Sequence, residues 1–140
     1  FNLANFIRTH LYASVGVLKL GNDILFNDEK VRVDRITGHG GLFKTKGVGQ
    51  RILAAAINSP ISVMETAGEG GAWGIALLAS YLVNNTNKQS LADYLDEVVF
   101  AGDAGVEIKP TKEDVAGFNK YIENYKACLA IEEAAVKAKN

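Results

Sequence analysis

A glycine-rich cluster between an apolar run and a helix-forming segment occurs twice in these 140 residues, and this pattern constrains the fold most. The first cluster, residues 37–41 (TGHGG), lies between a strand-like run at 31–36 and helix-forming residues 50–57. Glycine adopts left-handed backbone conformations and lets the chain approach a neighbour closely. A strand that ends in glycines and leads into a helix presents backbone N–H groups to an anion. The cluster is therefore either an anion-binding turn or a tight connection between packed elements.

The second cluster, residues 68–71 (GEGG), lies between a short strand candidate at 61–64 and an apolar segment at 72–83. The alternation of strand, glycine turn and helix predicts parallel strands covered by helices, an α/β fold. Residues 72–83 are apolar on all sides, which predicts a mostly buried helix with Trp73 in the core. Two such clusters on successive units favour a phosphate-bearing ligand over simple turns.

The flanking segments are mainly helical in pattern. Apolar residues recur at three- and four-residue steps over residues 2–20, and Gly21 with Asn22 is expected to end that helix. After the second cluster the chain becomes polar, with a short helix around 91–95 and a weak strand or loop at 98–100. No internal repeat is visible.

A long helix is predicted over residues 112–137, near the C-terminus. Thr111, followed three residues later by Asp114, forms a capping box at its start. One face carries the aromatic residues Phe118, Tyr121 and Tyr125. We expect this face to form an interface, because the helix lies beyond the units that carry the glycine clusters.

Charge and composition exclude several classes of function. Fifteen Lys and Arg against sixteen Asp and Glu give a net charge of -1, which lacks the basic excess of a nucleic-acid-binding protein. The longest apolar stretch, residues 73–83, is far shorter than the ~20 residues needed to span a bilayer. The single cysteine, Cys128, cannot form an internal disulfide, and the N-terminus lacks a secretory pattern. We expect a cytoplasmic protein with no nucleic-acid or membrane partner.

Two other interpretations of the glycine clusters stay open. Gly68, Gly70 and Gly74 form a loose version of the dinucleotide-binding fingerprint, which needs an acidic residue at the end of the next parallel strand. Asp93 and Asp96 have nearly the right spacing but lie in a helical pattern. The other alternative is a non-catalytic assembly domain whose glycines only form turns.

Three segments together resemble the adenosine-binding region of FGGY-type carbohydrate kinases. They are residues 38–56 (GHGGLFKTKGVGQRILAAA), 60–63 (PISV) and 69–79 (EGGAWGIALLA). In that family a paired glycine closes a strand, a small polar residue follows, a Gln lies near the next helix start, and an acidic-Gly-Ala-x-Gly-x-Ala helix comes after. The preceding helix and strand extend the resemblance over residues 1–85.

The resemblance implies the C-terminal part of an actin-like ATPase, or ribonuclease H-like, domain with an added C-terminal helix. Residues 1–85 would be the nucleotide side of the kinase C-terminal domain, and residues 86–140 a C-terminal extension. ATP and Mg²⁺ are the implied cofactors. Carried over by position, Gly41 and Thr45 would line the adenosine and α-phosphate, with Gly40 shaping the turn and Gln50 nearby. Thr45 stands where the family commonly has Asn or Ser.

The implied activity is transfer of the ATP γ-phosphate to a hydroxyl of a small sugar, and xylulose or ribulose kinases are the most similar members. The catalytic aspartate and the first phosphate loops of the family precede the matching segment. We therefore assign no catalytic residue and no metal ligand in this chain, and expect it to be inactive alone. Strands left without neighbours predict a homo-oligomer.

Overall fold

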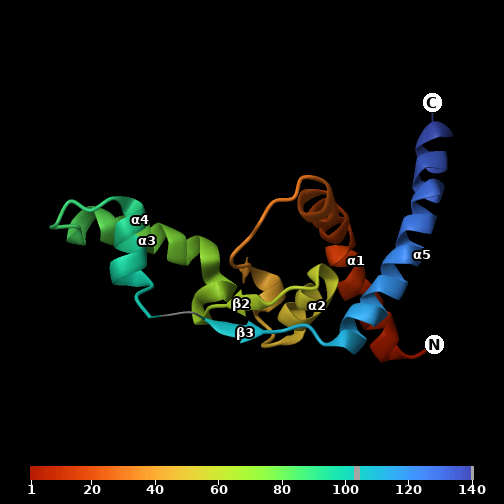
Figure 1. The fold of residues 1–140 in the computed structure, drawn as a ribbon, viewed down its shortest axis with the longest axis horizontal. Coiled ribbons are helices and arrows are strands. Elements are labelled where there is room, and N and C mark those ends of the chain that lie inside the picture. The colour runs from red at the N-terminus through yellow and green to blue at the C-terminus, as the bar shows by residue number, and fades with distance from the viewer. Residues whose placement is uncertain (103–104, 140) are drawn as a thin grey trace.

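The computed structural model describes residues 1–102 and 105–139, which form a helical body around a small sheet and a projecting arm (Figure 1). The helices are α1 (Leu3–Asp23), α2 (Val48–Ile57), α3 (Gly70–Asn84), α4 (Leu91–Tyr94) and α5 (Lys112–Lys137). The strands are β1 (Thr37–Gly38), β2 (Ile61–Val63) and β3 (Val106–Ile108). Short turns complete the fold: two 3₁₀ helices, Gly41–Phe43 and Glu65–Glu69, and two π-helical turns, Ile24–Asp28 and Leu95–Val99.

The sheet has the order β1-β2-β3 and mixes two strand directions. β1 pairs with β2 in parallel, with Thr37 opposite Ser62, which confirms the predicted parallel pair. β3 pairs with the other edge of β2 in antiparallel orientation, with Ile61 opposite Ile108. The antiparallel strand was not predicted, because three residues are too few to show a period-2 pattern.

The strand predicted at residues 31–36 is wrong in its position. In the described residues, the pairing with β2 begins only at Ile36, whose carbonyl oxygen accepts a hydrogen bond from Ser62 at 2.9 Å. The partner strand is short because Pro60, which has no N–H, immediately precedes β2. Residues upstream of Ile36 therefore have no neighbouring strand on that side and run as an irregular segment.

The core lies where α1, α2 and α5 meet above the sheet. Its buried members are Val15, Leu53, Ala54, Ala55, Ala56, Ile61, Phe118 and Ile122. The run of alanines in α2 allows the backbones of neighbouring elements to pack closely. Of the apolar face predicted for α1, only Val15 is buried, whereas Phe6, Ile7 and Leu18 are about half exposed.

The long C-terminal helix is confirmed, and its first turn is capped as predicted. The Thr111 hydroxyl accepts a hydrogen bond from the backbone N–H of Asp114 at 3.1 Å. The aromatic face does not form an external interface at Phe118, which is fully buried against the ring of Tyr12, 4.9 Å away between centroids. Tyr125 packs on Gly16 of α1, where an added Cβ would contact its ring at 3.4 Å. This aromatic face therefore attaches α5 to α1.

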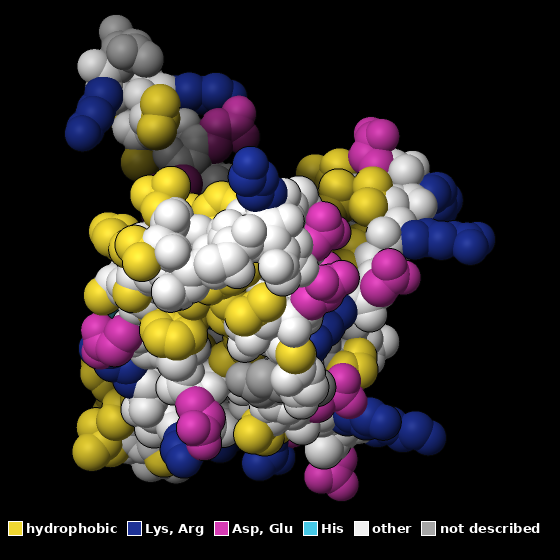
Figure 2. Space-filling view, turned by 90° about the vertical axis from the view of Figure 1, so that its left-hand side faces the viewer, with side chains coloured by type: hydrophobic (Ala, Val, Ile, Leu, Met, Phe, Trp, Pro, Cys, Tyr) yellow, Lys and Arg dark blue, Asp and Glu magenta, His cyan; other side chains and the backbone are white. Residues whose placement is uncertain are grey.

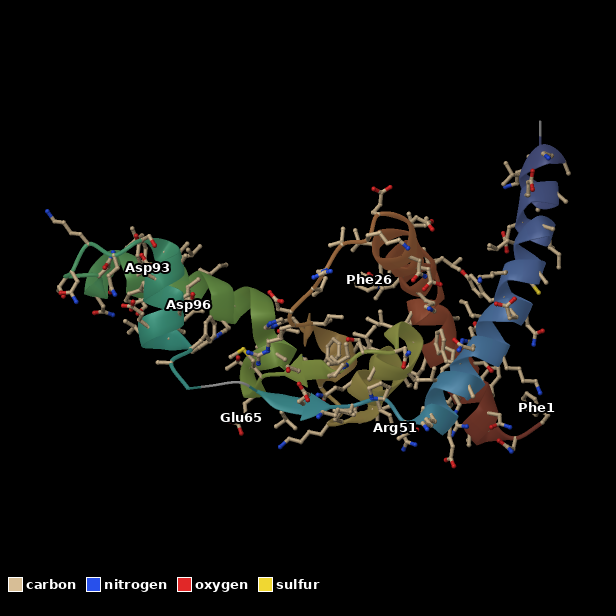
Figure 3. All side chains as sticks on the ribbon, in the orientation of Figure 1. Phe1, Phe26, Arg51, Glu65, Asp93 and Asp96 are labelled. Carbon is tan, nitrogen blue, oxygen red and sulfur yellow. The ribbon has the colours of Figure 1, made fainter. Side chains whose placement is uncertain are left out.

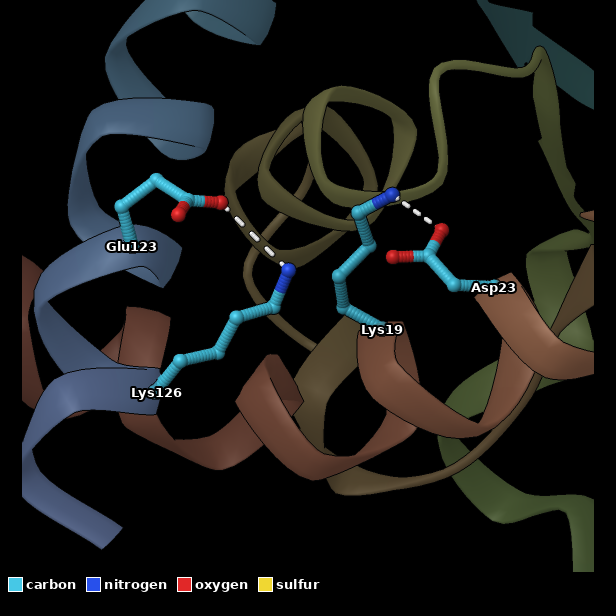
Figure 4. A network of polar contacts seen from close by, with 4 residues as sticks. All are labelled: Lys19, Asp23, Glu123 and Lys126. Atoms are coloured by element: carbon cyan, nitrogen blue, oxygen red, sulfur yellow. Dashed lines mark hydrogen bonds and ion pairs between the residues drawn. The ribbon is translucent and has the colours of Figure 1, made fainter.

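The end of α1 differs from the prediction. The helix continues through Gly21 to Asp23 and then widens into the π-helical turn Ile24–Asp28. A left-handed residue follows only at Lys30, with φ 55°. An ion pair within α1, between Lys19 and Asp23, spans the predicted end, and Figure 4 shows it beside the Lys126–Glu123 pair of α5.

The prediction of a buried helix at residues 72–83 is wrong. α3 has no buried residue, and Trp73, predicted to lie in the core, is 37% exposed. A 15-residue helix is about 22 Å long, whereas a three-residue strand is about 10 Å, so this sheet offers α3 no face of matching length. α3 instead runs out from the sheet, and α4 folds back along it to form the arm (Figure 1). Hydrophobic side chains are visible on the surface in the end-on view of Figure 2.

The weak strand or loop predicted at residues 98–100 falls in the arm. Residues up to Val99 belong to the π-helical turn that continues α4, and Phe100 follows it. The arm is held by hydrogen bonds between the hydroxyls of Ser80 and Tyr94 at 3.0 Å, and from Tyr81 to the carbonyl of Gln89 at 2.8 Å. Within the described residues, no helix is long and apolar enough to cross a membrane.

Candidate functional site

The two glycine clusters come together in the structure. The backbone N–H of Gly40 donates a hydrogen bond to the carbonyl oxygen of Ala67 at 2.7 Å, joining the turn after β1 to the 3₁₀ helix after β2. Because β1 and β2 are parallel neighbours, the segments that follow them leave the sheet at the same edge. The two glycine clusters therefore lie next to each other at this edge.

The first glycine cluster needs glycine at two positions for different reasons. Gly40 has φ 102° and ψ -176°, a region that residues with a Cβ avoid. A Cβ on Gly38 would lie 2.4 Å from the ring of Phe43, which folds back over the strand. The backbone therefore reverses sharply and then enters the 3₁₀ helix Gly41–Phe43.

A third glycine, Gly49, fixes the approach of this turn to α2. A Cβ at this position would lie 2.5 Å from the carbonyl oxygen of Leu42. α2 begins after Gly47, which has left-handed backbone angles, φ 76° and ψ -22°. Neither Gly47 nor Gly49 belongs to the predicted site, although the spacing of glycines through residues 47–49 was visible in the sequence.

A cavity of about 570 Å³ lies beside the turn, between the start of α2, the sheet and the second glycine segment. Its apolar wall consists of Phe43, Val63, Met64, Ala67, Val106 and Ile108. Its polar lining consists of Lys44, Thr45, Lys46, Gln50, Glu65 and Glu69, and the backbone of Gly47 and Gly68 completes it. The volume and mixed lining are typical of small-molecule sites.

The predicted site residues occupy different positions around this cavity. Thr45 and Gln50 line it, whereas Gly40 and Gly41 lie in the adjoining turn and do not. The N–H of Gly41, at the start of the 3₁₀ helix, donates no hydrogen bond within the described residues. Thr45 is exposed, so its hydroxyl is accessible from solvent.

Gln50 is a buried structural residue at the floor of the cavity. Its side-chain amide donates hydrogen bonds to the carbonyl oxygens of Ile61 at 2.7 Å and Val106 at 2.6 Å. One side chain of α2 thus holds β2 and β3 together. Any contribution of Gln50 to a ligand site therefore includes positioning of the cavity wall.

An ion pair crosses the rim of the cavity and joins the two glycine segments a second time. The Lys44 ammonium donates a hydrogen bond to the Glu69 carboxylate at 2.7 Å, and both side chains are more than half exposed. This hydrogen bond, and the positive charge of Lys44, lower the pKa of Glu69 below its ordinary value. The stem of Lys44 lies against Gly68, where a Cβ would approach the Lys44 Cγ to 3.1 Å.

Sequence reasoning missed most of the apolar wall. Val106 and Ile108 belong to the unpredicted strand β3, so their positions depend on a long-range pairing. Gly71 and Gly74 of α3 are not required for close packing, because an added Cβ at either would meet open space.

The comparison with known families decides the class of the protein. Residues 1–83 match the C-terminal domain of the FGGY family of carbohydrate kinases. The chain belongs to the FGGY family of carbohydrate kinases. No curated protein and no solved structure gives a significant match. The resemblance noted in the sequence is thereby confirmed at the level of the family.

Membership of the family indicates the class of reaction that such kinases catalyse. FGGY kinases transfer a phosphoryl group to a sugar hydroxyl and use ATP with Mg²⁺. The α/β fold, a small mixed sheet with helices, is consistent with the C-terminal domain of the family. The added strand β3 and helix α5 lie beyond the matched residues.

Within the part of the chain that the structure describes, the dinucleotide alternative lacks the strand it requires. Asp93 and Asp96 lie in α4 and the π-helical turn after it, out on the arm of this FGGY-family chain (Figure 3). Asp93 accepts a hydrogen bond from the Ser90 hydroxyl at 2.6 Å, as part of the cap of α4. Neither carboxylate ends a parallel strand next to the second glycine cluster.

Few acidic residues lie near the cavity to bind Mg²⁺. The described residues contain no cluster of three or more His, Cys, Asp or Glu that could hold a metal ion. Glu65 and Glu69 line the cavity, and Lys44 already holds Glu69. Mg²⁺ commonly binds through substrate phosphates with only one or two carboxylates. We assign no Mg²⁺ ligand to this chain.

Proposed function

We propose that this chain forms the nucleotide side of the active-site cleft of an FGGY sugar kinase, and that ATP binds at the first glycine turn. The observation that carries the proposal is the position of the cavity, which is lined by Thr45, four residues after Gly41, and by Ala67, whose carbonyl oxygen accepts a hydrogen bond from Gly40. A nucleotide needs an apolar recess for its base and N–H donors for its phosphates, and both are present here.

The base is proposed to occupy the cavity against Phe43, Val63 and Met64. A volume of about 570 Å³ accommodates a nucleoside, and the apolar wall provides surface for an aromatic ring. The α-phosphate then lies toward the unpaired N–H of Gly41, where the backbone can approach an anion closely. Thr45 offers its hydroxyl to the ribose or the base.

Phosphoryl transfer also needs a group that orients the sugar hydroxyl and accepts its proton. We propose that this group lies outside the 140 residues, because no acidic residue of the chain matches a catalytic motif of the family. The chain binds and positions the nucleotide, and Mg²⁺ offsets charge on the phosphate oxygens when the nucleotide is bound. Residues 86–140 are proposed to be an extension of this nucleotide-binding unit.

The sugar is proposed to be a pentulose, with xylulose or ribulose as the first candidates. The support is the Gly-Gly-x-x-Lys-x run, residues 40–45, and the long C-terminal helix, which resemble the pentulose kinases of the family. We propose that the kinase acts in the cytoplasm, as the single exposed Cys128 is consistent with a reducing compartment.

Calorimetric titration of the chain with ATP, ADP and NAD tests the nucleotide assignment. We expect ATP and ADP to bind at one site and NAD to bind more weakly. Tight binding of NAD alone would favour a dinucleotide module, and the absence of all binding would favour an assembly domain.

A coupled assay of ADP release with xylulose and ribulose tests whether the group that accepts the sugar proton lies outside this chain. We expect no turnover by the 140-residue chain. Robust turnover would show that the chain contains its own catalytic base and would overturn that part of the proposal.

A further inference from the structure

The ion pair between Lys44 and Glu69 lies at the rim of the cavity in which we propose that the nucleotide binds. Both residues line the cavity, and each belongs to one of the two segments that Gly40 and Ala67 hold together. The Lys44 ammonium is 2.7 Å from a Glu69 carboxylate oxygen. A cation that an incoming phosphate would attract is thus already paired with a carboxylate of the protein.

The pair can exchange partners readily. The side chains of Lys44 and Glu69 are 57% and 74% exposed, so water screens their attraction. The Lys44 ammonium can rotate on its flexible stem, and Gly68 leaves room for that stem beside the second cluster. A lysine ammonium forms charge-assisted hydrogen bonds with phosphate oxygens as it does with carboxylate oxygens.

We propose that Glu69 is a built-in competitor for Lys44, and that a bound nucleotide displaces it by pairing its phosphates with the Lys44 ammonium. Glu69 thereby sets the affinity for nucleotides according to the number of phosphates they carry. When no nucleotide is bound, the pair closes the rim and links the two glycine segments. This inference rests on the proposed function, because it requires a nucleotide in the cavity.

Two other residues of the lining provide matched controls. Glu65 also lines the cavity but makes no ion pair within the described residues, so Glu65→Gln removes the same charge without releasing Lys44. Lys46 is a second lysine of the lining without a carboxylate partner in that part of the chain. Lys46→Ala therefore reports the general effect of losing one positive charge.

The test is calorimetric titration of wild type, Glu69→Gln, Glu65→Gln, Lys44→Ala and the double variant Lys44→Ala/Glu69→Gln with ADP and with adenosine. We expect Glu69→Gln to tighten ADP binding about threefold more than Glu65→Gln does, and to leave adenosine binding unchanged. In the Lys44→Ala background the additional effect of Glu69→Gln should disappear, because the released cation is missing. In a Lys46→Ala background, by contrast, the additional effect of Glu69→Gln on ADP binding should persist.

The outcomes separate this inference from the proposed function. If ADP binds to wild type but Glu69→Gln and Glu65→Gln have equal effects, Glu69 does not compete for Lys44, and the inference is overturned while the proposed function stands. An equal gain for adenosine would also overturn it. If neither ADP nor adenosine binds to any variant, both the proposed function and the inference are wrong.

Discussion

Gly40 and Ala67 join the two glycine clusters through a backbone hydrogen bond of 2.7 Å, although 27 positions separate them in the chain. The bond is possible because β1 and β2 are parallel neighbours and their following segments leave the sheet together. It orients the turn so that the N–H of Gly41 is left without a protein acceptor within the described residues. The proposed anion site is thus a consequence of strand order.

Replacing Gly40 by alanine should destabilise the protein. The φ of 102° with ψ of -176° is a conformation that a Cβ disfavours, at a cost of roughly 1–3 kcal/mol in the free energy of unfolding. Gly71→Ala is the control, because its Cβ meets open space in a helix and should stabilise by roughly 0.5–1 kcal/mol. Urea unfolding monitored by circular dichroism measures both. Equal stability of the two variants would contradict the strained turn.

Gln50→Leu should destabilise the protein by removing the donor that Ile61 and Val106 share. Loss of the buried bond to the Ile61 carbonyl should cost roughly 1–3 kcal/mol, whereas the bond to Val106 is only partly buried, so water can replace it. Gln89→Leu is the control, since the side-chain amide of Gln89 bonds only the exposed Glu97 carboxylate and its loss should have a small effect. If both variants unfold at the same urea concentration as wild type, Gln50 does not hold the sheet.

Asp114 should make stability depend on pH. The bidentate hydrogen bonds from Arg51, at 2.6 and 3.0 Å, lower the pKa of Asp114 below its ordinary value of 3.8. A lowered pKa in the folded state means that the stabilisation is present above pH 3.8 and is lost as the pH falls through the folded value. The difference in melting temperature between wild type and Asp114→Asn should therefore shrink in acid. A difference that stays constant from neutral pH into acid would contradict this.

The exposed apolar residues of the arm predict self-association. Leu82 and Val83 are 82% and 79% exposed, and one edge of β1 has no partner strand within the described residues. Light scattering should show a dimer or larger assembly, and Leu82→Glu should shift it toward monomer. Asn87→Glu, an exposed change near the tip of the same arm, is the control. A wild-type chain that is monomeric at high concentration would contradict the prediction.

Local sequence signals predicted the elements that depend on local interactions. The cap of α5 by Thr111 needs only a hydroxyl and the backbone N–H of Asp114 three residues later, and it forms as predicted. The parallel pairing of β1 and β2 follows from a glycine turn and a helix between two short strands. The family resemblance was likewise visible, because its three segments follow one another closely in the chain, within residues 38–79.

The elements that depend on distant partners were not predictable. The apolar composition of α3 indicated burial, but burial needs a partner surface, and the three-residue strand β2 provides too little. The wall of the cavity formed by Val106 and Ile108 exists only because β3 pairs with β2 across a separation of more than 40 residues. Phe118 was assigned to an external interface because its partner, Tyr12, lies at the opposite end of the chain.

The central claim is that a nucleotide binds at the first glycine turn, and nuclear magnetic resonance with an isotopically labelled chain tests it most directly. Titration with ADP should shift the backbone amide signals of Gly40, Gly41 and Thr45, together with those of the facing 3₁₀ helix Glu65–Glu69. The amide of Val83, near the far end of α3, should move little, because its side chain is 79% exposed and lies on the arm away from the turn. Shifts confined to other parts of the chain, or no shifts at saturating ADP, would contradict the account.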